Sequence, residues 1–228
     1  MLLNIFRSGG DFKTKITTAL FSIIIVVISL TIHEFSHAVT ALALGDPTAK
    51  QRGRLTLNPL RHLNPIGTVM MLLFGFGYAE PVPINPNYFK HRKLGMAITA
   101  LAGPVSNLIL SFLAAIGIAL VSGIEVTSSA IYYTTTASLL LYTFFYYMHM
   151  MNLYLAIFNL IPVPPLDGSR IMFIFLPADK YFAVMKYEQY IMMGLIALLY
   201  FGVLDGPLSF ITGSISNGMM SLVHLFIK

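Results

Sequence analysis

The chain has 228 residues, a formal net charge of +5 and no cysteine. Hydrophobic residues make up 57% and charged residues 10%, and a mean hydropathy of +0.78 is typical of a membrane protein and excludes an ordinary soluble domain. The lack of cysteine excludes a disulfide framework, a thiol nucleophile and a cysteine-based zinc site. Lys and Arg lie at the ends of apolar segments and form no long basic run, so we expect a lipid bilayer as the environment and no nucleic-acid partner.

The first apolar stretch, Thr17 to Leu44, is long enough to cross a membrane. About 28 helical residues extend roughly 42 Å, against about 30 Å of hydrocarbon. The stretch lacks an A-x-A-like cleavage site and continues through the polar segment HEFSH at residues 33–37, so we expect it to be retained and not removed as a signal peptide.

The next part of the chain mixes polar and apolar residues. Arg54 to Leu57 alternates in a way that predicts a short interfacial strand. Pro65 to Ala79 is apolar but only about 15 residues long, which fits either a re-entrant segment or a span. Prolines at 81, 83 and 86 then predict an extended, edge-like loop, with Val82 to Asn85 able to pair with a substrate strand.

Four more apolar segments follow, at Leu94–Val121, Ile131–Ile161, Tyr190–Leu204 and Leu208–Ile227. The sequence therefore predicts an all-α polytopic membrane protein. It comprises one domain over residues 1–228, with five or six transmembrane helices and a short interfacial or re-entrant extended or β element after the first.

Charge predicts how these segments are oriented in the membrane. The loops Ser122–Ala130 and Asp205–Pro207 contain no Lys or Arg and are expected outside. The cytoplasmic side is then expected to hold Lys90 to Lys93, Arg170, Lys180, Lys186 and Lys228. The side of the N-terminus depends on whether Pro65 to Ala79 spans or re-enters.

The segment HEFSH carries the strongest chemical pattern. On a helix, His33 and His37 are four residues apart and project from one face, where two imidazoles can bind one Zn²⁺ ion. Glu34 is placed to accept a proton from an attacking water as the general base of peptide hydrolysis. The alternatives are buried polar residues that pair with neighbouring helices and a proton relay.

A catalytic zinc site needs a third protein ligand, and Asp167 is the best candidate. It lies in FNLIPVPPLDGSR, where three prolines break the preceding apolar segment and Gly168 provides backbone freedom. Broken helices inside membranes line cavities. The alternative is that Asp167 caps a helix over Ser169–Leu176.

Three motifs in this order resemble those of the site-2 protease family of intramembrane zinc metalloproteases, in the compact prokaryotic form without a PDZ domain. They are HEFSH at 33–37, AGPVSN at 102–107 and FNLIPVPPLDG at 158–168. The resemblance implies that His33, His37 and Asp167 bind one zinc ion and that Glu34 is the catalytic base. It also implies a multi-pass protein of the prokaryotic plasma membrane, whose active site opens towards the cytosol and cuts a transmembrane protein or peptide.

Other residues of these motifs have two interpretations each. Asn107 and Asn159 either bind the substrate backbone or oxyanion, or form interhelical hydrogen bonds. Gly103 and Pro104 are expected to permit close helix approach and a kink. Of the remaining histidines, His149 is the one expected near a buried cavity.

A different class of protein can use the same cluster. A proton-coupled transporter or a metal carrier also places His, Glu and Asp at membrane depth, without hydrolysis. The sequence specifies neither the natural substrate nor the oligomeric state.

Overall fold

The structure is a computed structural model that describes residues 5, 9, 11–74, 80–123 and 136–227. Within these ranges it is all-helical and contains no β-strand, which confirms the predicted all-α class. The elements in chain order are α2 (Phe12–Ala43), α3 (Thr48–Gln51), η1 (Pro59–Arg61), α4 (Pro65–Phe74), η2 (Pro86–Tyr88), α5 (Arg92–Gly123), α6 (Thr136–Asn159), α7 (Asp167–Met172), α8 (Ala178–Met185), α9 (Glu188–Tyr200) and α10 (Asp205–Phe226).

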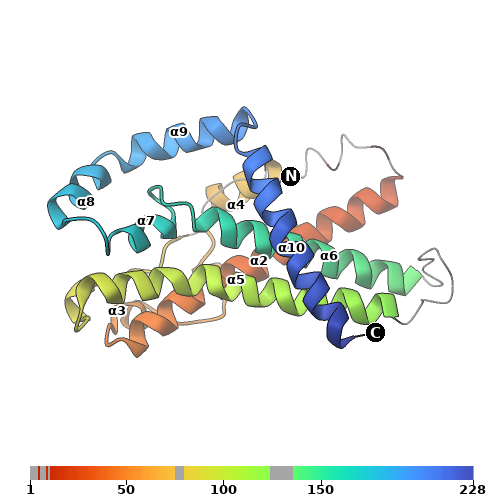
Figure 1. The fold of residues 1–228 in the computed structure, drawn as a ribbon, viewed down its shortest axis with the longest axis horizontal. Coiled ribbons are helices and arrows are strands. Elements are labelled where there is room, and N and C mark those ends of the chain that lie inside the picture. The colour runs from red at the N-terminus through yellow and green to blue at the C-terminus, as the bar shows by residue number, and fades with distance from the viewer. Residues whose placement is uncertain (1–4, 6–8, 10, 75–79, 124–135, 228) are drawn as a thin grey trace.

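The long helices α2, α5 and α6 form the centre of the molecule (Figure 1). Ile25 of α2, Ala114 of α5 and Met148 of α6 make one buried cluster. Small residues let these helices approach closely, as membrane helices require: a Cβ atom at Gly117 of α5 would lie 2.6 Å from the ring of Phe145. Their packing fixes the level at which residues of the three helices meet.

Helix α10 runs in the same direction as α5. Its first turns pack through Leu208 against Leu153 and Ile157 near the end of α6, and its last turns pack through Val223 against Ala115 and Ala119 in the second half of α5.

The start of α10 at Asp205 therefore lies towards the opposite end of the bundle from the end of α5 at Gly123. Helix α9 before it has 13 residues, about 20 Å of helix, which is less than the thickness of the hydrocarbon core.

The region after α2 is compact and irregular. Backbone N–H of Glu80 donates to the carbonyl of His62 at 2.8 Å, so the chain segments before and after α4 are bonded to each other. Arg54 forms an ion pair with Glu80 at 2.6 Å.

No strand forms at Arg54–Leu57, so that prediction is wrong. The N–H of Arg54 closes a turn onto the carbonyl of Ala49, and its side chain, not a ladder of backbone bonds, holds this stretch in place. Residues 81–85 form neither a helix nor a strand, and Asn85 has extended backbone angles (φ −112°, ψ 104°), so these residues are called the extended segment below.

Two helices in the described ranges are long and apolar enough to cross a membrane, Phe12–Ala43 and Arg92–Ser122. The bent pair Asp179–Met185 and Glu188–Tyr200, with 60° between its halves, is a third candidate if it forms one span. These findings support a membrane protein, whereas the predicted five or six transmembrane helices are not confirmed.

Candidate active site

The two histidines of HEFSH lie on one face of α2, as the helical period dictates. Their rings pack edge to face with centroids 4.7 Å apart. Each ring is fixed through Nδ1: that of His33 lies 2.5 Å from Oδ1 of Asn107, and that of His37 lies 2.7 Å from the carbonyl oxygen of Thr99. Because both partners are oxygen acceptors, both Nδ1 atoms are placed to donate, and in the neutral imidazole this leaves the lone pair of Nε2 for a metal ion.

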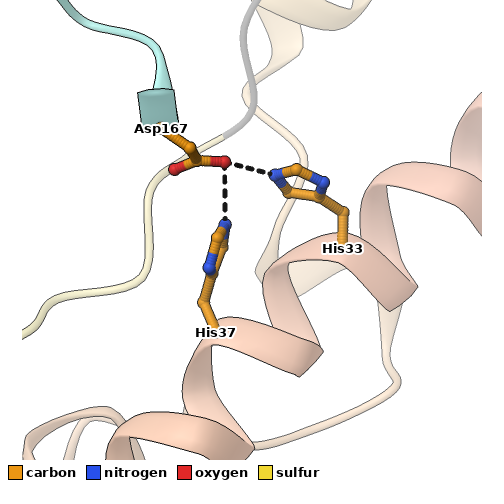
Figure 2. Close-up of side chains that lie close together, drawn as sticks. All are labelled: His33, His37 and Asp167. Carbon is orange, nitrogen blue, oxygen red and sulfur yellow. Dashed lines mark hydrogen bonds and ion pairs between the residues drawn. The ribbon is translucent and has the colours of Figure 1, made fainter. Parts of the chain in front are cut away.

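Asp167 faces these Nε2 atoms from the other side (Figure 2). Its Oδ2 lies 3.1 Å from Nε2 of His33 and 3.3 Å from Nε2 of His37. Asp167 is the first residue of α7, the capping position is Leu166, and no side chain caps this helix. The alternative of an Asp167 helix cap is therefore wrong.

The donor set fits a zinc ion. Zinc bonds of about 2.0–2.1 Å in a tetrahedron place neighbouring ligand atoms about 3.3 Å apart, close to both measured distances. The three ligand atoms of His33, His37 and Asp167 all lie within 4.8 Å of one another.

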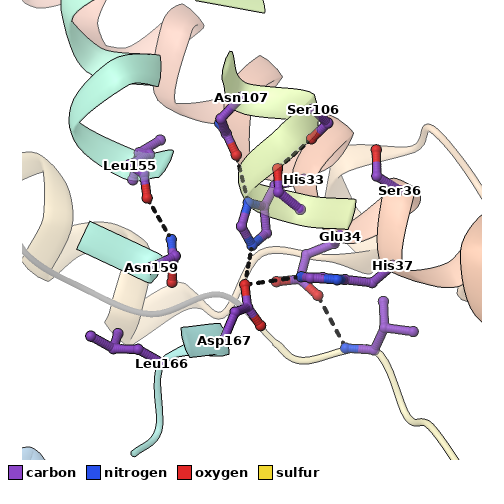
Figure 3. A network of polar contacts seen from close by, with 12 residues as sticks. His33, Glu34, Ser36, His37, Ser106, Asn107, Leu155, Asn159, Leu166 and Asp167 are labelled. Atoms are coloured by element: carbon purple, nitrogen blue, oxygen red, sulfur yellow. Dashed lines mark hydrogen bonds and ion pairs between the residues drawn. The ribbon is translucent and has the colours of Figure 1, made fainter. Parts of the chain in front are cut away.

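Glu34 lies beside the three donors without being one of them (Figure 3). It is 8% exposed, and its Oε2 accepts a hydrogen bond of 3.1 Å from backbone N–H of Val82 in the extended segment. That segment is itself anchored, since N–H of Asn85 donates to Oδ2 of the buried Asp46 at 2.7 Å. Glu34 therefore has one oriented carboxylate oxygen and a second oxygen available for chemistry.

All four residues open onto one cavity of about 520 Å³. Its other walls are mostly apolar and come from α4, α6, α9 and the extended segment, for example Met71, Phe158, Leu195 and Val82. A volume in this range is that of a small-molecule or short-peptide site. Polar groups in an otherwise apolar cavity define where a substrate amide would react.

The two asparagines are placed differently. Asn107 is fully buried on α5 and bonds to His33 without lining the cavity, which is the interhelical arrangement. Asn159 does line the cavity, near Asp167 (Figure 3), and one of its N–H groups donates to the carbonyl of Leu155 at 2.9 Å.

Two glycines determine how closely the site can be packed. A Cβ atom at Gly103 would lie 2.5 Å from Nε2 of His37 and 2.6 Å from Nε2 of His33, so the expected close approach is to the ligands themselves. Gly168 has no positive φ, and the expected use of its backbone freedom is wrong. It is required for space, because a Cβ there would lie 2.5 Å from the carbonyl oxygen of Ile161.

Sequence reasoning missed four groups around the site. The carbonyl of Thr99 and the N–H of Val82 are backbone atoms that no motif reveals. Arg170 lines the cavity one helical turn after Asp167, a spacing that could have been noticed. Asn152 bonds to Asn107. His149 lies away from the cavity, between Ser111 and Ser216.

A membrane helix bearing H-E-x-x-H, with a carboxylate from a broken helix as third ligand and an apolar cavity around them, defines a membrane-embedded zinc metallopeptidase. The model of peptidase family M50 matches residues 21–202. The chain belongs to this family.

Curated relatives agree with this assignment. YwhC of Bacillus subtilis, named as a candidate zinc metalloprotease, is 41% identical over 150 residues, which cover 66% of each chain. Rip2 of Mycolicibacterium smegmatis is 29% identical over 148 residues, covering 62% of this chain and 52% of the relative. Rip2 of Mycobacterium tuberculosis is 27% identical over 184 residues, covering 79% and 66%. Both Rip2 proteins carry the same designation as YwhC.

The matched part thus spans between about half and just under two thirds of these relatives. No solved structure matches the chain. The family predicted from the sequence is confirmed by the family model.

Proposed function

We propose that this chain is an intramembrane zinc metalloprotease that hydrolyses a peptide bond within or near the transmembrane segment of a membrane protein or peptide. The observation that carries the proposal is the convergence of His33, His37 and Asp167 beside Glu34, in a cavity whose walls are otherwise mostly apolar. Such a cavity accepts an apolar peptide, and the polar cluster is where its amide can be attacked.

In the proposed mechanism, His33, His37 and Asp167 hold the ion, which when bound polarises the scissile carbonyl and acidifies water. Glu34 accepts a proton from the attacking water through the oxygen that Val82 leaves free. As the new C–O bond forms and the C–N bond breaks, Glu34 returns that proton to the amide nitrogen. Asn159 is suited to donate its second N–H to the substrate carbonyl or oxyanion.

A substrate helix must unwind before this chemistry, because its amides are hydrogen-bonded within the helix. Pro81, Val82 and Ile84 of the extended segment line the cavity. An unwound substrate strand lying along them would be held by backbone pairing, with its side chains against the apolar walls.

The structure supports a re-entrant course for the segment around α4. Ten helical residues rise about 15 Å, half of the hydrocarbon thickness. The bond between Glu80 and His62 brings the two ends of the segment to one level. We therefore propose that His62 and Glu80, the two ends of this part of the chain, lie on the same side of the membrane.

This course gathers most cations at the end of the bundle where the active site lies (Figure 1). Of the 14 Lys and Arg residues, ten lie in or beside α3, η1, the start of α5, α7 and α8, namely Lys50, Arg52, Arg54, Arg61, Lys90, Arg92, Lys93, Arg170, Lys180 and Lys186. By the positive-inside rule this end is cytosolic in a prokaryotic plasma membrane. We propose a multi-pass protein that crosses through α2, α5, α6 and α10, with the α8–α9 pair at the cytosolic end and the site open to the cytosol.

The experiment that tests the function compares Glu34→Gln with Asp167→Ala in purified protein. We expect Glu34→Gln to lose cleavage of a single-pass substrate while it keeps one zinc ion per chain, and Asp167→Ala to lose both. Full peptidase activity in Glu34→Gln would contradict the proposal. A proton-coupled transporter or metal carrier would instead show flux in liposomes and no cleavage.

A further inference from the structure

A chain of hydrogen bonds connects the ligand His33 to the backbone of α6. Oδ1 of Asn107 on α5 lies 2.5 Å from Nδ1 of His33, and Nδ2 of Asn107 donates to Oδ1 of Asn152 on α6 at 2.8 Å. Nδ2 of Asn152 in turn donates to the carbonyl oxygen of Met148 at 2.8 Å. Both asparagine side chains are fully buried. No water is needed to complete the series.

The direction of this chain is set at its far end. The carbonyl of Met148 can only accept, so the Asn152 amide must turn its NH₂ group towards it and its oxygen towards Asn107. That oxygen in turn requires the NH₂ group of Asn107, which leaves Oδ1 of Asn107 facing His33. An oxygen at this position requires a proton on Nδ1 of His33, and in the neutral ring this leaves Nε2 unprotonated and able to bind a metal ion.

His37 is held in the same tautomer, with its proton on Nδ1, by a single contact, because the backbone carbonyl of Thr99 bonds to its Nδ1 directly. An asparagine alone does not impose this order on His33. If the Asn107 amide were reversed, its NH₂ group would face Nδ1, the proton would move to Nε2, and the ligand lone pair would be lost. Asn107 needs a neighbour that fixes its orientation.

We propose that Asn152 is a positioning residue of the metal site, which acts through Asn107 to hold His33 in the tautomer that binds zinc. The proposal rests on the proposed function in taking His33 as a ligand. It goes beyond that function in assigning a role to a residue on α6 outside the three sequence motifs and outside the cavity lining. Groups that orient histidine ligands in this way typically change metal affinity by about 10- to 100-fold.

The test is a double-mutant cycle on the full-length protein in detergent, with the zinc dissociation constant measured by chelator competition. We expect Asn152→Leu to raise this constant about 10- to 100-fold. In an Asn107→Asp background, either carboxylate oxygen can accept the Nδ1 proton of His33. The tautomer of His33 then no longer depends on Asn152. There we expect Asn152→Leu to change the constant by less than about threefold.

A second readout is the visible absorption spectrum of the cobalt-substituted protein, which reports the ligands directly. Asn152→Leu should alter the spectrum, and Asn152→Asp, whose neutral acid can donate to Met148 and accept from Asn107, should restore it. Thr143→Val is the matched control on α6, since Thr143 bonds only to the carbonyl of Leu139 in its own helix. We expect wild-type zinc binding there.

The outcomes separate the two proposals. A wild-type protein that binds no zinc would overturn the proposed function itself. Equal losses from Asn152→Leu in both backgrounds would indicate an interhelical bond alone and overturn the positioning role. Wild-type zinc affinity in folded Asn152→Leu would also overturn the positioning role, but it would leave the proposed function intact. If Asn152→Leu does not fold, Asn152→Ala takes its place in the cycle.

Discussion

The backbone of Gly103 on α5 lies directly against the imidazole of His37 on α2, close enough that a Cβ atom at 103 would lie 2.5 Å from Nε2. The same Cβ would lie 2.6 Å from Nε2 of His33. The side chain that is absent at Gly103 is therefore what allows both ligand nitrogens to face Asp167.

Gly103→Ala should consequently displace the histidines and weaken zinc binding by about 100-fold or more, since both ligands must move. Gly117→Ala is the matched control on the same helix. There the clash is with the Phe145 ring, so we expect a loss of about 1–3 kcal/mol in stability with zinc binding intact. Zinc titration and thermal melts of both variants measure these effects, and unchanged zinc affinity in Gly103→Ala would contradict this account.

Gly168→Ala tests the second close approach. Its Cβ would meet the carbonyl oxygens of Leu160 and Ile161, which are backbone atoms that cannot rotate away. We expect Asp167 to shift, zinc affinity to fall by about tenfold or more, and stability to drop by about 1–3 kcal/mol.

Gly213→Ala on α10 is the matched control for this substitution, because no atom lies within 4 Å of its Cβ position. In mid-helix the same change should stabilise the protein by up to about 1 kcal/mol. A Gly168→Ala protein that binds zinc as tightly as Gly213→Ala would show that the segment can relax.

The site shows which features a sequence can specify. The spacing of His33 and His37 is a local property of a helix, and the prolines before Asp167 indicate a broken segment, so these three residues could be predicted together. The bond from Asn107 to His33 and that from Val82 to Glu34 depend on the register between distant elements. No local pattern encodes that register.

The same limit applies to predicting the fold from the sequence. Helix positions follow from long apolar runs, and α2 and α5 agree with the prediction to within a few residues. The direction of α10 does not follow, because it depends on where α9 ends and on Val223 packing against Ala115.

Metal removal should destabilise the fold as well as abolish activity. His33 and His37 come from α2 and Asp167 from α7, so a bound ion links two elements that are far apart in the chain. At free zinc about a thousandfold above its dissociation constant, the linkage stabilises the protein by about 4 kcal/mol. Melts with and without a chelator measure this difference, and Asp167→Ala should show no zinc dependence. If the chelator leaves the melting temperature of the wild-type protein unchanged, the protein does not bind an ion at this site.

Asp46→Ala should loosen the segment that orients Glu34. Asp46 is fully buried and accepts N–H bonds from Thr48 at 2.9 Å and Asn85 at 2.7 Å. Its loss leaves two part-buried N–H donors without this acceptor, at a cost of up to about 1 kcal/mol each. Hydrogen exchange over residues 81–85 should accelerate and kcat/KM should fall, while zinc stays bound.

Asp11→Ala removes a carboxylate with comparable chemistry, the cap at the start of α2. It should cost about 1 kcal/mol without affecting exchange at 81–85. Equal exchange over 81–85 in the Asp46 and Asp11 variants would show that Asp46 does not anchor the segment.

The proposed topology can be tested by labelling single introduced cysteines. The chain has no cysteine of its own, so none has to be removed first. Lys50→Cys and Lys186→Cys lie at the active-site end and should react with an impermeant maleimide only from the cytosolic side. Lys13→Cys at the start of α2 and Leu225→Cys near the end of α10 should react only from the outside, because the last turns of α10 pack against the second half of α5. Labelling of Leu225→Cys from the cytosol would mean that α10 does not lie in the membrane as its packing on α5 and α6 requires. Lys50→Cys and Lys186→Cys share a side only if His62 and Glu80 lie on the same side of the membrane, so labelling from opposite sides would contradict the proposed re-entrant course.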